Sequence, residues 1–137
     1  MNYPRSPKDP VGGIVYLGRM LDKIRLMAAG KLHPDLHANL GTGFDERTAT
    51  FLGVDYDAIQ ARTLQGGTDE EVLEWCHQKG APASDEQVEI WNAFMTKRGW
   101  NDEMSATLVR RKKESGLENR DDIQTMFAYI DADEGRA

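Results

Sequence analysis

Glycine residues divide this sequence into short pieces, and the division limits the folds that the chain can adopt. They follow stretches in which apolar residues recur at three- and four-residue spacing, at Gly30, Gly53, Gly66, Gly67, Gly80, Gly99 and Gly116. Glycine is common just after a helix, because it adopts a left-handed backbone without steric cost. The pattern therefore predicts a series of short helices joined by short turns.

Two of these helices are expected to begin with a capping box. In the stretch TDEE, the Thr68 hydroxyl and the Glu71 carboxylate would each satisfy a backbone N–H group that has no partner within the helix. The stretch SDEQ repeats the arrangement with Ser84 and Gln87. Each box predicts a helix start from local chemistry alone.

Single capping residues and glycines predict the other helix boundaries. We expect a first helix that ends at Gly30, a second from about Glu46 to Leu52 with Asp45 as N-cap, and a third from Asp55 to Gly66. Beyond the two helices with capping boxes, we expect one from the N-cap Asn101 to about Ser115 and a last one from about Asp121 onward. No segment shows sustained alternation of apolar and polar residues, so we expect no sheet. The predicted fold is an all-α, single compact domain of six to seven short helices packed at angles.

The first 14 residues differ from the rest in composition. They contain the helix breakers Pro4, Pro7, Pro10, Gly12 and Gly13. We therefore expect an extended, Pro/Gly-rich N-terminal arm over residues 1–14, followed by a single helical domain over residues 15–137. A chain of 137 residues has the size of one domain and can bury a core without metal or disulfide support.

The charge of the chain argues against general binding to nucleic acid. The formal net charge is −6 at neutral pH, so phosphate backbones would be repelled on average. The one basic block, Arg110 to Lys113, is predicted at a helix C-terminus, where cations favour the negative end of the helix dipole. We interpret this block as a solvated helix face, with a partner-docking patch as the alternative.

The same sequence predicts a cytoplasmic protein with no membrane-spanning segment. No apolar run approaches the length needed to cross a bilayer, and the first residues have no apolar signal region. Cys76 is the only cysteine, which excludes an internal disulfide and fits a reducing compartment.

No cofactor or metal is expected. His33 and His37 flank a proline, and Cys76 and His77 lie far away in sequence, which is a poor match to zinc-ligand spacing. The stretch that begins at Gly41 starts like a dinucleotide-binding motif but lacks its third glycine and a preceding strand.

The stretch WNAFMTKRGW, residues 91–100, has aromatic rings next to positive charge. One interpretation is structural: Gly99 would end the helix, Trp100 would fold back onto its last turn, and Trp91 would lie in the core. Lys97 and Arg98 would then favour the helix C-terminus. Only Asn92 has no structural role in this interpretation.

The first helix carries charged residues and one leucine opposite its apolar face. Asp22 would form exposed ion pairs with Arg19 and Arg25 there, and Lys23 lies on the same side, but Leu26 does not fit a solvated surface. Our leading prediction is therefore a non-enzymatic domain that acts by binding, as a protein-interaction or small-ligand module. Leu26 is the candidate interface residue for an unknown protein partner or for a second copy in a homodimer.

The alternative is an enzyme or binding protein for a small anionic metabolite. Such a site would bring cationic, polar and aromatic side chains into one pocket. The candidate residues are Arg19, Asp22, Lys23, Trp91, Asn92, Lys97, Arg98 and Trp100.

Six segments resemble, in order, a bacterial family designated domain of unknown function 5069. They are LGRMLDKIR (17–25), NLGTGFD (39–45), FLGVDYD (51–57), GTDEEVLEWC (67–76), WNAFMTKRGW (91–100) and DDIQTMF (121–127). The resemblance covers nearly the whole chain. It implies a small, soluble, all-helical bacterial protein, and it implies no particular activity, substrate or catalytic residue.

Overall fold

The computed structural model describes residues 2–136, which form eight helical elements and no strand. In chain order these are α1 (Leu17–Ala28), the 3₁₀ helix η1 (Pro34–Asn39), α2 (Phe44–Leu52), α3 (Tyr56–Leu64), α4 (Asp69–Lys79), α5 (Asp85–Lys97), α6 (Ser105–Glu114) and α7 (Met126–Asp133). The prediction of a compact, all-helical domain is confirmed for this part of the chain. None of the described helices is both long and apolar enough to span a membrane.

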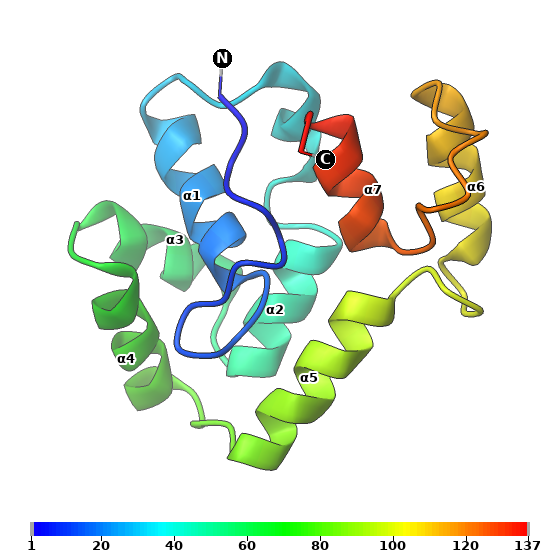
Figure 1. Ribbon diagram of the computed structural model, residues 1–137. Coiled ribbons are helices and arrows are strands. Elements are labelled where there is room, and N and C mark those ends of the chain that lie inside the picture. The colour runs from blue at the N-terminus through cyan, green and yellow to red at the C-terminus, as the bar shows by residue number, and fades with distance from the viewer. Residues whose placement is uncertain (1, 137) are drawn as a thin grey trace.

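Helix α1 lies at the centre of the molecule. Its apolar residues Leu17, Met20, Leu21 and Ile24 are at most 1% exposed, and the helix packs against α3. Figure 1 shows α3 and α4 on one side of α1, with α6 and α7 on the other and α5 along the remaining edge. The spacing of these apolar residues is the one that predicted the helix from the sequence.

A second, smaller apolar cluster lies between α6 and α7. It contains Leu108, Ile123, Met126 and Tyr129. The ring of Phe44, at the start of α2, packs against both this cluster and the main core. Phe44 therefore joins the α6–α7 unit to the rest of the domain.

The N-terminal segment packs into the main core. Val11 and Ile14 are 3% and 1% exposed, and Val15 is also buried. The Tyr16 backbone N–H donates a hydrogen bond to the Pro7 carbonyl oxygen, which folds the segment back on itself. The segment therefore contributes to the same core as the helices, and the boundary after residue 14 stays a prediction.

The local signals in the sequence differ in how well they predicted the helix ends. Both capping boxes are present, at Thr68 and at Ser84. The prediction of Asp45 as an N-cap is wrong, because α2 already begins at Phe44 and the Asp45 carboxylate is turned into the interior. Residues 34–39 lie between the first two helices that the sequence predicts, and they form η1.

The start of α6 was also predicted wrongly. Asn101 adopts a left-handed backbone conformation in a turn, with φ of 48°, and the helix begins only at Ser105. The Asp102 carboxylate accepts hydrogen bonds from the backbone N–H groups of Gly99 and Met104, and the Met104 N–H is one that an Asn101 cap would have satisfied. Likewise the last helix begins at Met126 rather than Asp121, with Thr125 as its N-cap.

A cluster of four charged residues ties the N-terminal segment to α1 and α4. Arg5 bonds Asp22 of α1 at 2.8 Å and Asp69 of α4 at 2.8 Å, and Arg25 of α1 bonds Asp69 at 2.6 Å. Burial alone would raise the pKa of Asp69, but the hydrogen bonds from Arg25 and Arg5 outweigh it and hold the pKa below its ordinary value of 3.8. Asp69 of α4 therefore pairs with one arginine of the N-terminal segment and one of α1, and so connects three segments.

We predict that Asp69→Asn lowers the free energy of unfolding by about 1–3 kcal/mol at neutral pH, because it removes charged hydrogen bonds to two arginines. Because the folded-state pKa is lowered, the wild-type advantage is present above pH 3.8 and is lost as the pH falls through the folded-state value. Urea unfolding over this pH range measures it. The exposed neighbour Glu70 provides the control Glu70→Gln, and a difference that is independent of pH would contradict the prediction.

Candidate functional site

A cavity of about 510 Å³ opens between α1 and α2 on one side and α6 and α7 on the other. We call it the polar cavity. Its lining residues are Tyr16, Arg19, Lys23, Asp35, Leu36, Asn39, Thr42, Gly43, Phe44, Arg47, Arg98, Met104, Arg111, Glu114, Ser115, Met126, Tyr129, Ile130, Asp133 and Glu134. Residues of α1, η1, α2, α6 and α7 therefore contribute to one concave surface.

A buried ion pair forms part of the wall of the polar cavity. The Lys23 ammonium donates to Asp45 Oδ2 at 2.9 Å, and these side chains are 3% and 0% exposed. The Tyr16 hydroxyl donates to Asp45 Oδ1 at 2.8 Å, and the Gly41 backbone N–H donates to Oδ2 at 3.0 Å. Asp45 thereby connects α1, the loop after η1 and the first turn of α2.

Burial shifts the pKa values in this group in opposite directions. It lowers the pKa of Lys23, an effect that the attraction of Asp45 partly offsets. Burial, together with the adjacent Asp45 charge, raises the pKa of Tyr16 well above its ordinary value. Tyr16 therefore keeps its proton at neutral pH and acts as a hydrogen-bond donor to the carboxylate.

Tyr16 also has an unusual backbone. Its φ of 73° and ψ of −29° lie in the left-handed region at the N-terminus of α1. A bulky residue in this region is strained, and such strain is found where surrounding contacts impose it. Here the hydroxyl bond to Asp45 and the packing of the Tyr16 ring against Phe127 and Phe44 hold the residue in place.

A second buried pair joins α1 to the end of α7. The two terminal nitrogens of Arg19 donate to the two carboxylate oxygens of Glu134, at 2.8 and 2.6 Å, and both side chains are 3% exposed. Burial acts to lower the pKa of Arg19, but the hydrogen bonds and charge of Glu134 outweigh it and raise the pKa. Arg19 and Lys23 lie one turn apart on α1, so both cations face the same cavity.

Three further arginines line the polar cavity, and acidic side chains neutralise them less completely than they do Arg19 and Lys23. The Arg98 guanidinium is 3.4 Å from Asp102 and lies over the Phe94 ring, and its buried Nε has no hydrogen-bond partner among the described residues. Within residues 2–136, Arg47 and Arg111 form no ion pair. Arg47 and Arg111 thus have no ionic partner among the described residues, and Arg98 keeps its Nε unpaired beside its contact with Asp102, so these groups can bind an anion.

The candidate residues from the sequence separate into different environments. Arg19, Lys23 and Arg98 meet at the polar cavity, whereas Asp22 pairs with Arg5 and takes no part in its lining. Lys97 is exposed and lines no cavity described here.

The predicted fold-back of Trp100 onto the last turn of α5 is wrong. Arg98 leaves the helical conformation, with ψ of 128°, and Gly99 follows with φ of 102°. The Trp100 backbone N–H then bonds the Lys97 carbonyl oxygen at 3.0 Å, which closes a type II turn and leaves Trp100 54% exposed.

Asn92 has a structural role that its sequence position did not reveal. Its Oδ1 accepts a hydrogen bond from the Val15 backbone N–H at 3.1 Å, and its Nδ2 donates to the Gly13 carbonyl oxygen at 2.8 Å. The neighbouring Trp91 is buried, as predicted, and its indole N–H donates to the Val15 carbonyl oxygen at 3.2 Å. These two side chains of α5 anchor the N-terminal segment.

Leu26, the predicted interface residue, is partly buried, and the interface stays a prediction. In the part of the chain that the structure describes, no three His, Cys, Asp or Glu side chains form a group that would hold a metal ion. Burial raises the pKa of Cys76 to about 11, so its thiol stays protonated at neutral pH.

Sequence reasoning missed several residues of the polar cavity. Arg47 and Arg111 were not candidates. Asp45 and Glu134 were not recognised as partners of the α1 cations, and Tyr16 was not recognised as a partner of Asp45. The charges themselves were visible, but the partners lie 22 and 115 residues away along the chain. An unusually polar side of a central helix was the one available signal.

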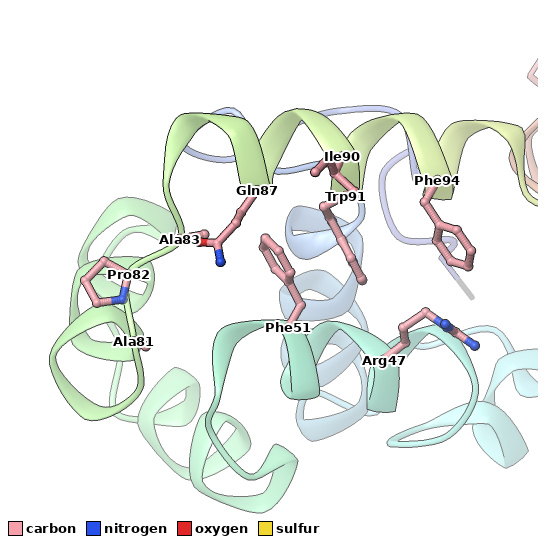
Figure 2. A pocket seen from close by; sticks show the side chains of 9 residues that line it. All are labelled: Arg47, Phe51, Ala81, Pro82, Ala83, Gln87, Ile90, Trp91 and Phe94. Carbon is pink, nitrogen blue, oxygen red and sulfur yellow. The ribbon is translucent and has the colours of Figure 1, made fainter.

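A separate apolar groove of about 530 Å³ lies between α2 and α5. Figure 2 shows its lining residues, which are Arg47, Phe51, Ala81, Pro82, Ala83, Gln87, Ile90, Trp91 and Phe94. The rings of Phe51 and Trp91 stack at a centroid distance of 4.5 Å and separate the two ends of the groove.

Comparison with known families gives one match over almost the whole chain. The model of the family described as "Domain of unknown function (DUF5069)" matches residues 1–136. No curated protein matches the chain.

We predict that Asn92→Ala lowers the free energy of unfolding by about 1–3 kcal/mol, because it leaves the Val15 N–H and the Gly13 carbonyl without their partner. Hydrogen exchange at the Val15 amide should become faster, and denaturant unfolding measures the loss of stability. Asn119→Ala, in an exposed turn, is the control. Unchanged exchange at Val15 would contradict the assigned role.

Proposed function

The chain belongs to the DUF5069 family, and we propose that it binds a small anionic metabolite in the polar cavity. The observation that carries the proposal is the convergence of five cationic side chains from four helical segments on one cavity. They are Arg19, Lys23, Arg47, Arg98 and Arg111. This corresponds to the alternative that the sequence left open beside a protein-interaction domain.

The charge balance supports an anionic ligand. The lining has five cationic and four acidic side chains, and Lys23 is paired with Asp45 behind the lining, so the cavity is close to neutral in a chain whose net charge is −6. Glu134 is already paired with Arg19, so the attraction falls to Arg47, Arg98 and Arg111. Guanidinium groups bind carboxylate and phosphate oxygens with two parallel hydrogen bonds, which suits this class of ligand.

The size and the remaining walls suit a metabolite of modest size. A volume of about 510 Å³ lies within the range of small-molecule sites. Phe44, Met104, Met126 and Ile130 supply apolar surface beside the arginines. Such a lining favours a molecule with an anionic group and an apolar or mixed body.

The buried pairs support binding by holding the cavity walls before a ligand arrives. The Lys23–Asp45 and Arg19–Glu134 pairs connect α1 to α2 and α7. Binding therefore has to order few further side chains, which lowers its entropic cost. The hydroxyls of Ser115 and Tyr129 lie 2.5 Å apart in the lining. Burial raises the pKa of Tyr129, so this pair offers a donor to the ligand rather than a base.

We predict that Arg111→Gln weakens binding of such a ligand about 10- to 100-fold, because it removes a charged hydrogen bond. A thermal-shift screen of carboxylates and phosphates would find the ligand, since one at 100 times its Kd stabilises by about 2.7 kcal/mol. Isothermal titration calorimetry would then give the affinities.

The adjacent Arg110 provides the matched control. It is exposed and lies outside the cavity lining, so Arg110→Gln should leave the affinity unchanged. Equal losses in the two variants would show a general charge effect and contradict the assigned site. A screen in which no anion raises the melting temperature would contradict the proposed function.

A further inference from the structure

Two large apolar side chains that line the apolar groove are exposed to solvent. Ile90 is 61% exposed and Phe94 is 39% exposed, and both line the groove from α5. Figure 2 shows Phe94 and Arg47 at one end of the groove, and Ala81, Pro82 and Ala83 at the other. Large exposed apolar side chains around a concave surface are typical of a binding site.

The floor and the far end of the groove are fixed by the fold. The Trp91 ring is held by its stack with Phe51 and by its N–H bond to Val15. At Gly80 a Cβ atom would lie 2.1 Å from the Leu52 carbonyl oxygen, so only glycine allows the loop to approach α2 this closely. The loop that continues through residues 81–83 is therefore set against the end of α2.

The groove has one ionic group. Arg47 is exposed and forms no ion pair within residues 2–136, and its guanidinium carbon lies 5.1 Å from the centre of the Phe94 ring. The other lining residues are apolar except for Gln87. The acidic residues Asp85, Glu86 and Glu89 of α5 are exposed and do not line the groove.

We propose that the apolar groove is a second ligand site, for a small molecule with an apolar body and one carboxylate. The carboxylate would bind Arg47, and the body would lie over Phe51 and Trp91 towards residues 81–83. The single cation at one end sets this orientation, and the volume of about 530 Å³ suits such a ligand. Arg47 also lines the polar cavity, so the two sites share this one guanidinium group, and the other residues of the groove line the apolar groove alone.

The probe is 4-phenylbutanoate, compared with its uncharged analogue 4-phenylbutan-1-ol. Titration followed by NMR should shift the signals of Ala81, Ala83 and Ile90, with saturable binding at millimolar concentration. The acid should bind about tenfold more tightly than the alcohol, and Arg47→Gln should abolish that difference. Ile90→Ser, at an exposed position that leaves the core unchanged, should weaken both compounds.

Arg111→Gln distinguishes the two sites, because Arg111 lines only the polar cavity. It should leave binding of the probe unchanged, whereas a loss of binding with shifts around α6 and α7 would place the probe in the polar cavity and overturn the proposal. Equal affinity for acid and alcohol would overturn the role of Arg47.

Two other outcomes would also overturn the proposal. One is the absence of saturable binding at millimolar concentration. The other is a dimer in light scattering that Ile90→Ser dissociates, which would show that a second copy of the chain covers the groove.

Discussion

The buried ion pair between Lys23 and Asp45 is the interaction on which the cavity side of this fold depends. Burying two charges is costly unless each has a full set of partners. Asp45 has them, since Lys23, the Tyr16 hydroxyl and the Gly41 N–H all donate to its carboxylate. The first turn of α2 and the start of α1 are thereby held together, and the backbone of Tyr16 is held in its left-handed conformation.

The proposed binding function follows from the position of these charges on a central helix. Arg19 and Lys23 belong to α1, whose opposite face is buried in the core. Their backbone positions are therefore fixed by the packing of that helix. Each is paired with a carboxylate from a distant segment, and the cavity that results is also lined by Arg98 and Arg111. A net-acidic protein thus has a recess whose lining contains five cationic and four acidic side chains.

The sequence predicted the helices well because their signals are local. The Thr68 and Ser84 capping boxes act within four residues, and apolar spacing along α1 identified the face that meets the core. The sequence could not predict the ion pairs of Lys23 and Arg19. Asp45, the partner of Lys23, has the local pattern of an N-cap, and Glu134, the partner of Arg19, lies near the far end of the chain. The prediction that Trp100 folds back onto α5 was wrong because Gly99 adopts its left-handed conformation in a type II turn rather than in a Schellman motif.

A double-mutant cycle on Lys23 and Asp45 tests the central claim most directly. Lys23→Met and Asp45→Asn keep the approximate shapes while removing one charge each, and urea unfolding gives the free energy of each variant and of the double variant. The account predicts a loss of about 3–5 kcal/mol for each single change and a double variant that loses much less than their sum, because no charge is left unpaired. Losses that add within about 0.5 kcal/mol would show that the two residues do not depend on each other.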